Sequence, residues 1–502
     1  MRTVFAGLLL AVIAPALAGA TTDREPIGVA GARHLLNRAG FGASDAEVRA
    51  FSSLSRAEAV DRLLEGVRTE PTIGPPAFVS EPFVPYYRFR ALDAEARAAQ
   101  LRKRRQEGFA LRAWWLHEMS VTPSPFAERM TLFWHGHFAT SQRKVRSVRL
   151  MYAQHELLRR EALGNFGRLL HGIARDPAML VYLDNAGSRR GAPNENFARE
   201  VMELFTLGEG HYTERDVKEA ARAFTGWSLD RDSGEYRYRR AWHDRGEKTV
   251  LGRTGRLEGA EVLDVLLANP RTAEHVSAKL WREFISPVPD EGEVKRLGAI
   301  FRSAGYEVKP LVRALFLSDS FWSPEHRATL IKSPVDLIVG TLRTFGIRPV
   351  DFRPAAFAAA VLGQNLFSPP NVKGWPGGEA WIDASTLLGR RQFIDRVFRG
   401  NDPMMAEAPA PTAPMSAVST AGAGTTTRRP GEAMRRSLER GMSSYAFMPE
   451  RWSRDVDNGS SERGAYIAGL VLAADPANPV PSAQDEAALV RALVADPVFQ
   501  LR

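Results

Sequence analysis

The sequence predicts one large all-α domain, an array of antiparallel helix pairs with a small β-hairpin excursion, over residues 28–400. Three observations predict this fold. Apolar residues recur three or four positions apart along most of the chain, the period of a helix buried on one face. Serine or threonine followed three residues later by an acidic residue marks several helix starts. Only the segment from Trp227 to Leu251 lacks a helical period.

The first half of this body reads as helices joined by short turns. Ser44 with Glu47 and Ser55 with Glu58 form two capping boxes, each starting a short helix. Ser124 is the expected N-cap of a helix that begins at Pro125. The apolar period predicts further helices over residues 29–38, 93–119, 147–161, 165–174 and 177–183.

The second half begins with a helix from Pro193, whose buried face carries Phe197, Val201, Leu204 and Phe205. Thr213 with Asp216 starts the next helix. The alternation YRYRR at 236–240 predicts a β-hairpin or an extended segment. Helices are expected again over residues 259–268, 271–284, 292–303, 309–317, 334–345, 354–362 and 384–398.

The two ends differ in composition from the body. Residues 1–20 have a positive start, a short apolar run and small residues before a cleavage point, which predicts a signal peptide and export to the periplasm or outside. No transmembrane segment is expected in the mature protein. Residues 401–428 are rich in Ala, Pro, Thr and Gly and predict a disordered linker. Residues 429–502 form a C-terminal appendage that either docks back or stands apart.

The composition of the chain excludes several classes of catalytic and binding site. The chain of 502 residues contains no cysteine, so thiolate catalysis, thiolate zinc sites and haem attachment through cysteine are excluded. Its formal charge of +9 comes mostly from scattered arginine, and the basic block at 102–105 reads as a solvated stripe, so no nucleic-acid partner is expected. The sequence has no nucleotide-binding motif and no serine-hydrolase elbow.

The helix that begins at Pro193 has an unusually polar back. At 100° per residue, one arc gathers five polar side chains, namely Glu195, Asn196, Arg199, Glu200 and Glu203. One interpretation is a solvated face with ion pairs from Arg199 to Glu195 and Glu203, each worth ~0.3–0.5 kcal/mol. The other is a catalytic site. Clustered carboxylates repel, so one holds its proton while another stays ionised, as glycosidic-bond cleavage requires.

Residues outside this arc complete the candidate site. Tryptophans near glycine can stack against sugar rings. With the polar residues beside them and at the helix start, the candidate substrate-binding set is Asn194, Asn196, Trp227, Lys373, Trp375 and Trp381. Core packing is the alternative role of the tryptophans. His243 and Asp244 are candidates for a general base or a further ligand.

A metal site is an alternative. His135 and His137 share a face only if their segment is extended, which the expected helix end permits. With Glu200 or Glu203 they could hold a divalent metal such as zinc, manganese or iron. The other interpretation is that one histidine caps the helix and the other packs against aromatic neighbours.

Several motifs resemble a known family. They include ARHLLNRAGFG at 32–42, MTLFWHGHFATS at 130–141, PNENFAREVMELFTLGEGHYTE at 193–214 and LFSPPNVKGWPGG at 366–378. In these motifs the chain resembles the large bacterial domain-of-unknown-function family numbered eighteen hundred. The resemblance implies no established activity. It implies export and a companion role beside a second exported family that looks like a sulfatase or alkaline phosphatase.

The leading hypothesis is an exported, carboxylate-based hydrolase acting on a cell-surface or environmental polymer, most of all a glycan. One alternative is a non-enzymatic binding or assembly factor that works with the exported sulfatase- or phosphatase-like companion. The other alternative is a metal-dependent enzyme that uses histidine and glutamate ligands.

Overall fold

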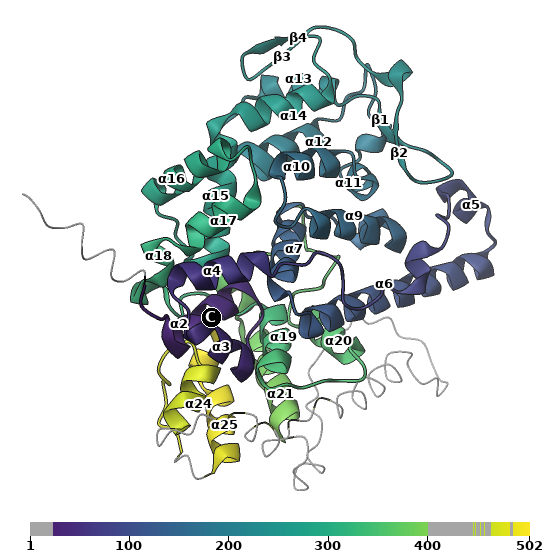
Figure 1. Cartoon of the computed structure of the whole chain (residues 1–502). Helices are drawn as coiled ribbons and strands as arrows, with labels where there is room; N and C mark the ends of the chain where they lie inside the picture. The colour runs from purple at the N-terminus through teal and green to yellow at the C-terminus, as the bar shows by residue number, and fades with distance from the viewer. Residues whose placement is uncertain are drawn as a thin grey trace, which may run out of the picture.

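The computed structural model describes residues 24–399, 463–481 and 485–502, together with Tyr445, Phe447, Trp452 and Val456. This part of the chain is a helical body with two small β-hairpins, which confirms the all-α prediction (Figure 1). The predicted signal peptide at 1–20 and linker at 401–428 lie outside the described residues. No helix in the described part is long and apolar enough to cross a membrane.

The first half of the body contains helices joined by short loops, at positions close to those that the apolar period predicts. In chain order they are α2 (Gly28–Ala39), α3 (Asp45–Ser52), α4 (Arg56–Glu65), α5 (Tyr86–Ala91), α6 (Ala94–Val121), α7 (Pro125–His137), α8 (Gln142–Val145), α9 (Val148–Arg160), α10 (Phe166–Ala174), α11 (Pro177–Tyr182), α12 (Glu195–Glu200) and the π-helical turn η3 (Val201–Leu207). Short 3-10 turns occur at η1 (Ala77–Ser80) and η2 (Asn185–Gly187).

The excursion after α13 (Glu214–Ala223) consists of two hairpins and not one. In the first, β1 (Trp227–Leu229) pairs antiparallel with β2 (Tyr236–Tyr238), and in the second β3 (Lys248–Val250) pairs with β4 (Arg253–Gly255). The helices that follow are α14 (Gly259–Ala268), α15 (Pro270–Phe284), α16 (Glu291–Ser303), α17 (Val308–Phe316), α18 (Asp319–Trp322), α19 (Pro334–Thr344), α20 (Arg353–Val361), α21 (Ala384–Arg399), α24 (Arg463–Val471) and α25 (Glu486–Ala495). The remaining 3-10 turns are η4 (Arg240–Trp242), η5 (Pro324–His326), η6 (Gly378–Trp381) and η9 (Pro497–Gln500).

The predicted capping boxes form. At the start of α3 the backbone N–H of Ser44 donates to Glu47 (2.8 Å), and that of Glu47 donates to the Ser44 hydroxyl (3.3 Å). Ser124 is the N-cap residue of α7 as predicted, but its hydroxyl does not cap the helix, because it accepts a hydrogen bond from the backbone N–H of Arg68 (2.9 Å) and none from α7. Pro125 still begins that helix. Reciprocal boxes also form at Ser55 with Glu58 and at Thr213 with Asp216.

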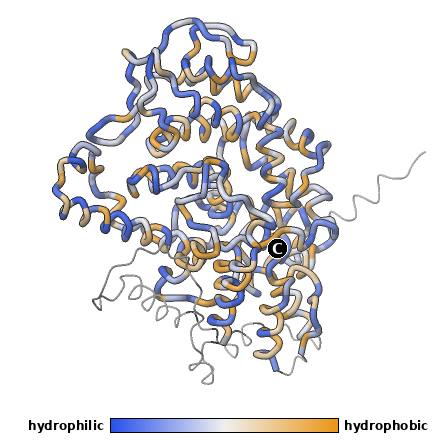
Figure 2. The backbone as a smooth tube through the Cα atoms, turned by 180° about the vertical axis from the view of Figure 1, so that it is seen from behind, coloured by the Kyte–Doolittle hydropathy of each residue, from blue (hydrophilic) through white to orange (hydrophobic). Residues whose placement is uncertain are grey.

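The core is formed by two clusters of buried apolar side chains. One joins α7, α10, η3 and the helices α13 to α17, and it includes Trp134, Phe166 and Phe205. The other joins α6, α9, α19 to α21 and the C-terminal helices, and it includes Trp115 and Leu493. Apolar and polar residues alternate along most helices, as the tube in Figure 2 shows. Most helices bury one face, whereas α19 is buried on nearly all sides and α5 has no buried residue.

The C-terminal segment docks on the body. Helix α24 packs against α2, and α25 packs against α21. The backbone N–H of Lys332 donates to the Gln500 carbonyl (2.7 Å), and that of Arg502 donates to the Leu330 carbonyl (2.7 Å). Of the two arrangements that the sequence leaves open, the structure has the docked one.

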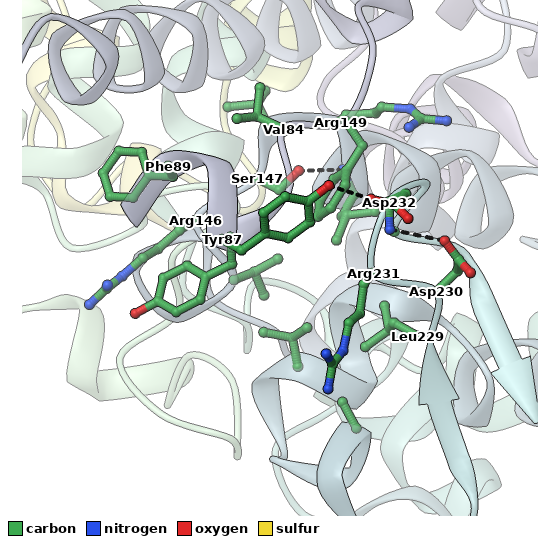
Figure 3. A pocket seen from close by; sticks show the side chains of 18 of the residues that line it. Val84, Tyr87, Phe89, Arg146, Ser147, Arg149, Leu229, Asp230, Arg231 and Asp232 are labelled. Carbon is green, nitrogen blue, oxygen red and sulfur yellow. Dashed lines mark hydrogen bonds between the residues drawn. The ribbon is translucent and has the colours of Figure 1, made fainter. Parts of the chain in front are cut away.

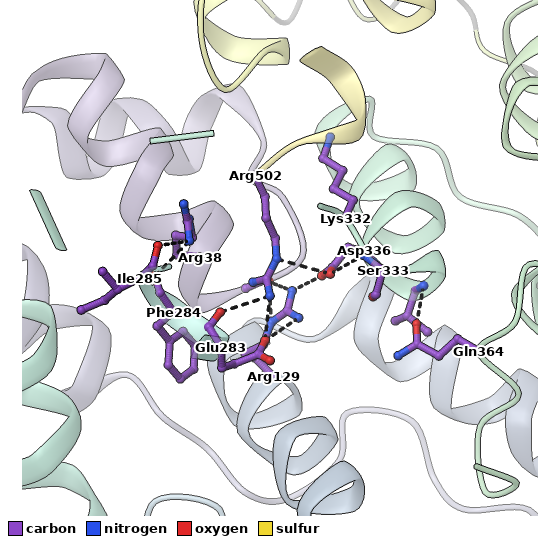
Figure 4. Close-up of polar contacts among 12 residues, drawn as sticks. Arg38, Arg129, Glu283, Phe284, Ile285, Lys332, Ser333, Asp336, Gln364 and Arg502 are labelled. Atoms are coloured by element: carbon purple, nitrogen blue, oxygen red, sulfur yellow. Dashed lines mark hydrogen bonds and ion pairs between the residues drawn. The ribbon is translucent and has the colours of Figure 1, made fainter. Parts of the chain in front are cut away.

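A buried cluster of charges joins α7, α15, α19 and the C-terminal residue (Figure 4). Arg129 forms ion pairs with Asp336 and with Glu283, the latter at 3.3 Å. Arg502 contacts the same two carboxylates, at 2.9 Å from Glu283 and 3.5 Å from Asp336. Burial raises the pKa of Asp336, but the charges of Arg129 and Arg502 outweigh it and hold that pKa well below its usual value. Asp336 is therefore ionised.

Arg502→Ala tests how much this cluster stabilises the fold. Removing one cation leaves the buried Asp336 and the partly exposed Glu283 to share Arg129, so the free energy of unfolding should fall by on the order of 3 kcal/mol. Denaturant titration followed by circular dichroism measures the change. Arg491→Ala is the control, because Arg491 is an exposed arginine on the neighbouring helix. Equal stability of the two variants would contradict the prediction.

Candidate functional site

The helix that carries the acidic residues changes geometry part-way. Asn194 caps α12, since its side chain accepts from the Phe197 N–H (3.1 Å) and donates to the Leu183 carbonyl (2.8 Å). The chain then continues as η3, a π-helical turn that ends at Gly208 with φ of 84°. The prediction of one regular helix over residues 193–205 is thus corrected. Such π-helical turns are frequent at functional sites.

A basic stripe on α15 accompanies this turn. Arg271, His275 and Lys279 lie four residues apart and therefore share one helix face. The Arg271 Nε donates to the Leu207 carbonyl (3.2 Å), and the Lys279 Nζ donates to the Leu204 carbonyl (3.0 Å). The His275 Nε2 lies 3.2 Å from that same Leu204 oxygen. These donors satisfy carbonyls at the end of η3 that have no helical partner of their own.

Arg199 does not pair with acidic residues of its own helix, so the ion pairs expected for a solvated face are not formed. It forms a bidentate ion pair with Glu214 in the first turn of α13, at 2.6 and 2.9 Å. The expected pairs from Arg199 to Glu195 and Glu203 do not form within the described residues. Glu200 and Glu203 are therefore left as neighbours without a guanidinium between them.

Glu200 and Glu203 have different surroundings. Burial raises the pKa of Glu200, the charge of Glu203 raises it further, and the charge of Lys373 opposes both. Glu203 instead accepts a hydrogen bond from the Tyr212 hydroxyl. Burial and this hydrogen bond raise the pKa of Tyr212 to about 12, so the phenol keeps the proton that it donates. The two carboxyl groups thus differ in their surroundings: burial and a neighbouring negative charge raise the pKa of Glu200, whereas Glu203 has a hydrogen-bond donor of its own.

The loop between α20 and α21 brings Lys373 and Trp375 to this region. Gly374 has φ of 83°, and a Cβ there would lie 2.6 Å from the carbonyl oxygen of Gly136. Only glycine permits this approach, so the loop rests on the last turn of α7. The Trp375 ring lies 5.5 Å from the His135 ring. Its Nε1 is buried and has no hydrogen-bond partner in the described part of the chain.

His135 and His137 both lie in the last turn of α7 and point in different directions, so the extended geometry considered above does not occur. The His135 Nε2 accepts from the Phe367 N–H (3.1 Å), and burial lowers the pKa of His135 to about 3. The His137 Nδ1 lies 3.0 Å from the Lys279 ammonium and its Nε2 lies 3.2 Å from the Phe205 carbonyl. Burial and the Lys279 charge hold the pKa of His137 well below its usual value. Both rings are neutral.

The candidate metal ligands are not brought together. On each of these two rings the acceptor nitrogen already receives a hydrogen bond from a protein donor. Among the residues that the structure describes, no group of three or more His, Asp or Glu side chains could hold a metal ion. The histidine and glutamate ligand set that the sequence suggested for zinc, manganese or iron is therefore not assembled.

His243 and Asp244 organise the loop between the two hairpins. The His243 Nδ1 lies 3.0 Å from the Thr225 carbonyl oxygen. Asp244 forms a bidentate pair with Arg222, at 2.8 and 3.2 Å, and this pairing lowers the pKa of Asp244 to about 2. These contacts favour a structural role over the catalytic role expected from the sequence.

The other candidates for substrate binding differ in exposure. Trp227 is only 4% exposed and packs on Phe224, and Trp381 is 6% exposed, so burial argues against both as stacking platforms. Trp375 is partly exposed, and Lys373 and Asn196 are exposed. Asn194 uses its amide in the helix cap. Glu195 is partly exposed in the first turn of α12.

Sequence reasoning missed four residues around the glutamate pair. Tyr212 contacts Glu203, while His275 and Lys279 donate to η3. Tyr182 lies close enough to Glu200 that the carboxylate charge adds to the effect of burial in raising the pKa of the phenol. The four-residue spacing of the basic stripe was the one signal present in the sequence.

These features define an all-helical protein with a pair of electrostatically coupled glutamates on an irregular helix. The chain belongs to the family described as protein of unknown function (DUF1800), whose model matches residues 34–501. The match passes beyond residue 400 and takes in the docked C-terminal helices. Searches of curated proteins and of solved structures found no match.

The charges of Lys373 and Glu203 act on Glu200 in opposite directions, so removing each should shift the pKa of Glu200 with opposite sign. Lys373→Ala removes a positive charge that lowers the pKa of Glu200, so that pKa should rise. Glu203→Gln removes a negative charge that raises the pKa of Glu200, so that pKa should fall. Titration by carbon NMR of protein labelled at the glutamate carboxyl measures both, with Glu200→Gln assigning the signal. Shifts of the same sign in the two variants would contradict the coupling.

Proposed function

We propose that this protein is an exported enzyme that hydrolyses glycosidic bonds, with Glu200 as the general acid and Glu203 as its carboxylate partner. One observation carries the proposal. The charge of Glu203 acts on Glu200, burial raises the pKa of Glu200 in the same direction, and the Tyr212 hydroxyl donates a hydrogen bond to Glu203 alone. This division of roles is the one that glycoside hydrolysis requires.

The reaction adds water across the glycosidic carbon–oxygen bond. Glu200 gives its proton to the leaving oxygen while that bond breaks. Glu203 removes a proton from the attacking water, or attacks the sugar carbon and is then released by water; the stereochemistry of the product distinguishes the two routes. In either route Glu200 recovers its proton from water. The Tyr212 hydroxyl holds one Glu203 oxygen and leaves the other for the reaction.

Lys373 and Trp375 support the proposal as groups that could position a sugar. Lys373 is exposed and its charge acts on Glu200, and Trp375 follows two residues later on a loop fixed to α7. Export rests on the composition of residues 1–20.

A non-enzymatic binding or assembly role, with an exported sulfatase- or phosphatase-like companion, is the second candidate function. One observation favours it. A pocket of about 1240 Å³ is lined by none of the proposed catalytic residues. In this second candidate the pocket is the functional site, and replacement of the two glutamates leaves function intact.

Replacing the two glutamates tests the enzymatic proposal. Purified protein is incubated with a panel of neutral and acidic polysaccharides, and new reducing ends are measured. Glu200→Gln and Glu203→Gln should each lower turnover by roughly 10²–10⁴-fold, because each removes a group that moves a proton or bonds to carbon. Glu209→Gln is the matched control, since Glu209 is exposed just beyond η3. Turnover at the wild-type rate in both variants would rule the proposal out.

A further inference from the structure

The pocket of about 1240 Å³ lies between two projecting parts of the chain (Figure 3). One wall comes from α5 and the first half of α6, which extend away from the rest of the body (Figure 1). The other comes from residues 144–150 and from the β1–β2 hairpin. The walls meet where the Tyr87 hydroxyl donates to Asp232 (2.6 Å). Beside this contact Gly234, at φ of 74°, leaves no room for a Cβ against Phe83.

The acidic side chains that line the pocket all have partners. Asp184 pairs with Lys144 (2.5 Å), and Asp232 accepts from a tyrosine hydroxyl. The other three are engaged in the same way: Glu81 and Glu107 with Lys103 (2.6 and 3.6 Å), and Asp230 with Arg237 (2.7 Å). Three cations, Lys103, Lys144 and Arg237, thus neutralise part of the charge of these five carboxylates.

The arginines that line the pocket have no carboxylate partners in the part of the chain that the structure describes. None of the six forms an ion pair within the described residues; they are Arg90, Arg104, Arg146, Arg149, Arg231 and Arg239. Arg149 and Arg239 donate to carbonyl or hydroxyl oxygens, and Arg104 lies over the Phe89 ring at 4.4 Å. Arg146, in residues 144–150, and Arg231, in the β1–β2 hairpin, both belong to the second wall; they are exposed and make no side-chain hydrogen bond in the described part (Figure 3). The pocket has uncompensated positive charge.

Apolar side chains are exposed in the same place. Of the eleven large hydrophobic residues exposed in the described part of the chain, four line this pocket: Val84, Tyr86, Tyr87 and Leu101. Tyr86 is 56% exposed and Tyr87 is 50% exposed. Exposed aromatic rings beside free guanidinium groups can stack on a sugar face and pair with an acidic substituent at once.

We propose that this pocket binds an acidic glycan, a polysaccharide that bears carboxylate or sulfate groups. The arginines match its charges, the tyrosines match its ring faces, and the five carboxylates remain able to accept hydrogen bonds from sugar hydroxyls. A glycan presents several hydroxyl donors on each ring to these carboxylates, whereas the backbone of a nucleic acid presents a phosphate on every nucleotide and few donors. Hydrogen-bond complementarity thus favours the glycan.

The pocket adjoins the glutamate pair, so the inference rests in part on the proposed function and supplies its substrate class. Lys144 lines the pocket, and its ammonium lies 5.8 Å from the centre of the Tyr182 ring. The negative charge of Glu200 raises the pKa of the same phenol. Tyr182 thus connects the pocket to the glutamate pair, and in the proposed arrangement a bound glycan chain extends past it toward Glu200.

Binding is tested separately from turnover by calorimetric titration of full-length Glu200→Gln protein, which does not cut the ligand. The probes are hexagalacturonate, its methyl ester, a sulfated heparin hexasaccharide and an oligothymidylate of equal charge. At least one acidic oligosaccharide should bind, and each probe that binds should do so at least tenfold more tightly than the methyl ester. Adding Arg146→Gln with Arg231→Gln should weaken that binding by tenfold or more. Adding Tyr86→Ala should weaken it several-fold.

Arg253→Gln is the matched control, because Arg253 is an exposed arginine on β4 outside the pocket. Absence of binding by both acidic oligosaccharides would overturn the inference, as would equal losses in the control and the double arginine variant. Tighter binding of the oligothymidylate, lost in that double variant, would assign the pocket to nucleic acid instead. Arginine-dependent glycan binding without turnover by the wild-type protein would support the pocket and refute the proposed hydrolysis.

Discussion

The ion cluster around Asp336 is the constraint on which the arrangement of the site depends. Arg129, near the start of α7, is tied to Glu283 at the end of α15 and to Asp336 on α19. Two turns further along α7, His137 meets Lys279 of the same α15. The two helices are thus fixed to each other at two points. Buried charges are costly to desolvate, and here each carboxylate is matched by two guanidinium groups.

The fixed pair of helices α7 and α15 positions the segments around the acidic residues. The end of α7 carries the glycine on which the loop with Lys373 and Trp375 rests, and the basic stripe of α15 donates to the carbonyls of η3. The irregular helix is therefore held by donors outside itself. The electrostatic environment of Glu200 is set by its burial and by the charges of Glu203, Lys373 and, to a smaller extent, Arg199, which is itself paired with Glu214.

Local signals predicted the helices well, because capping and apolar period act within one turn of the residues concerned. Both serine boxes near the N-terminus form, and Thr213 starts α13 as expected. The π-helical turn was not predictable in this way. The side chains that donate to its carbonyl oxygens lie some seventy residues later in the chain, on α15. The same holds for the burial of Trp227 and for the pocket, whose walls come from segments far apart in sequence. The acidic arc was found, but not which residues pair across it.

The separation between the charged pocket and the glutamate pair has a chemical consequence for a polymer substrate. Interactions made far from the reacting bond can be used to orient and distort that bond, provided that one ligand reaches both places. Here the pocket supplies guanidinium groups and aromatic rings. The region of α12 and η3 supplies two carboxyl groups, and its one arginine, Arg199, is already paired with Glu214. Lys144, which lines the pocket, lies beside Tyr182, and the charge of Glu200 acts on the same phenol. A chain that fills the pocket and passes these two residues would place an uncharged linkage, not an acidic substituent, beside Glu200, where the carboxylate of Glu203 would repel a second negative charge.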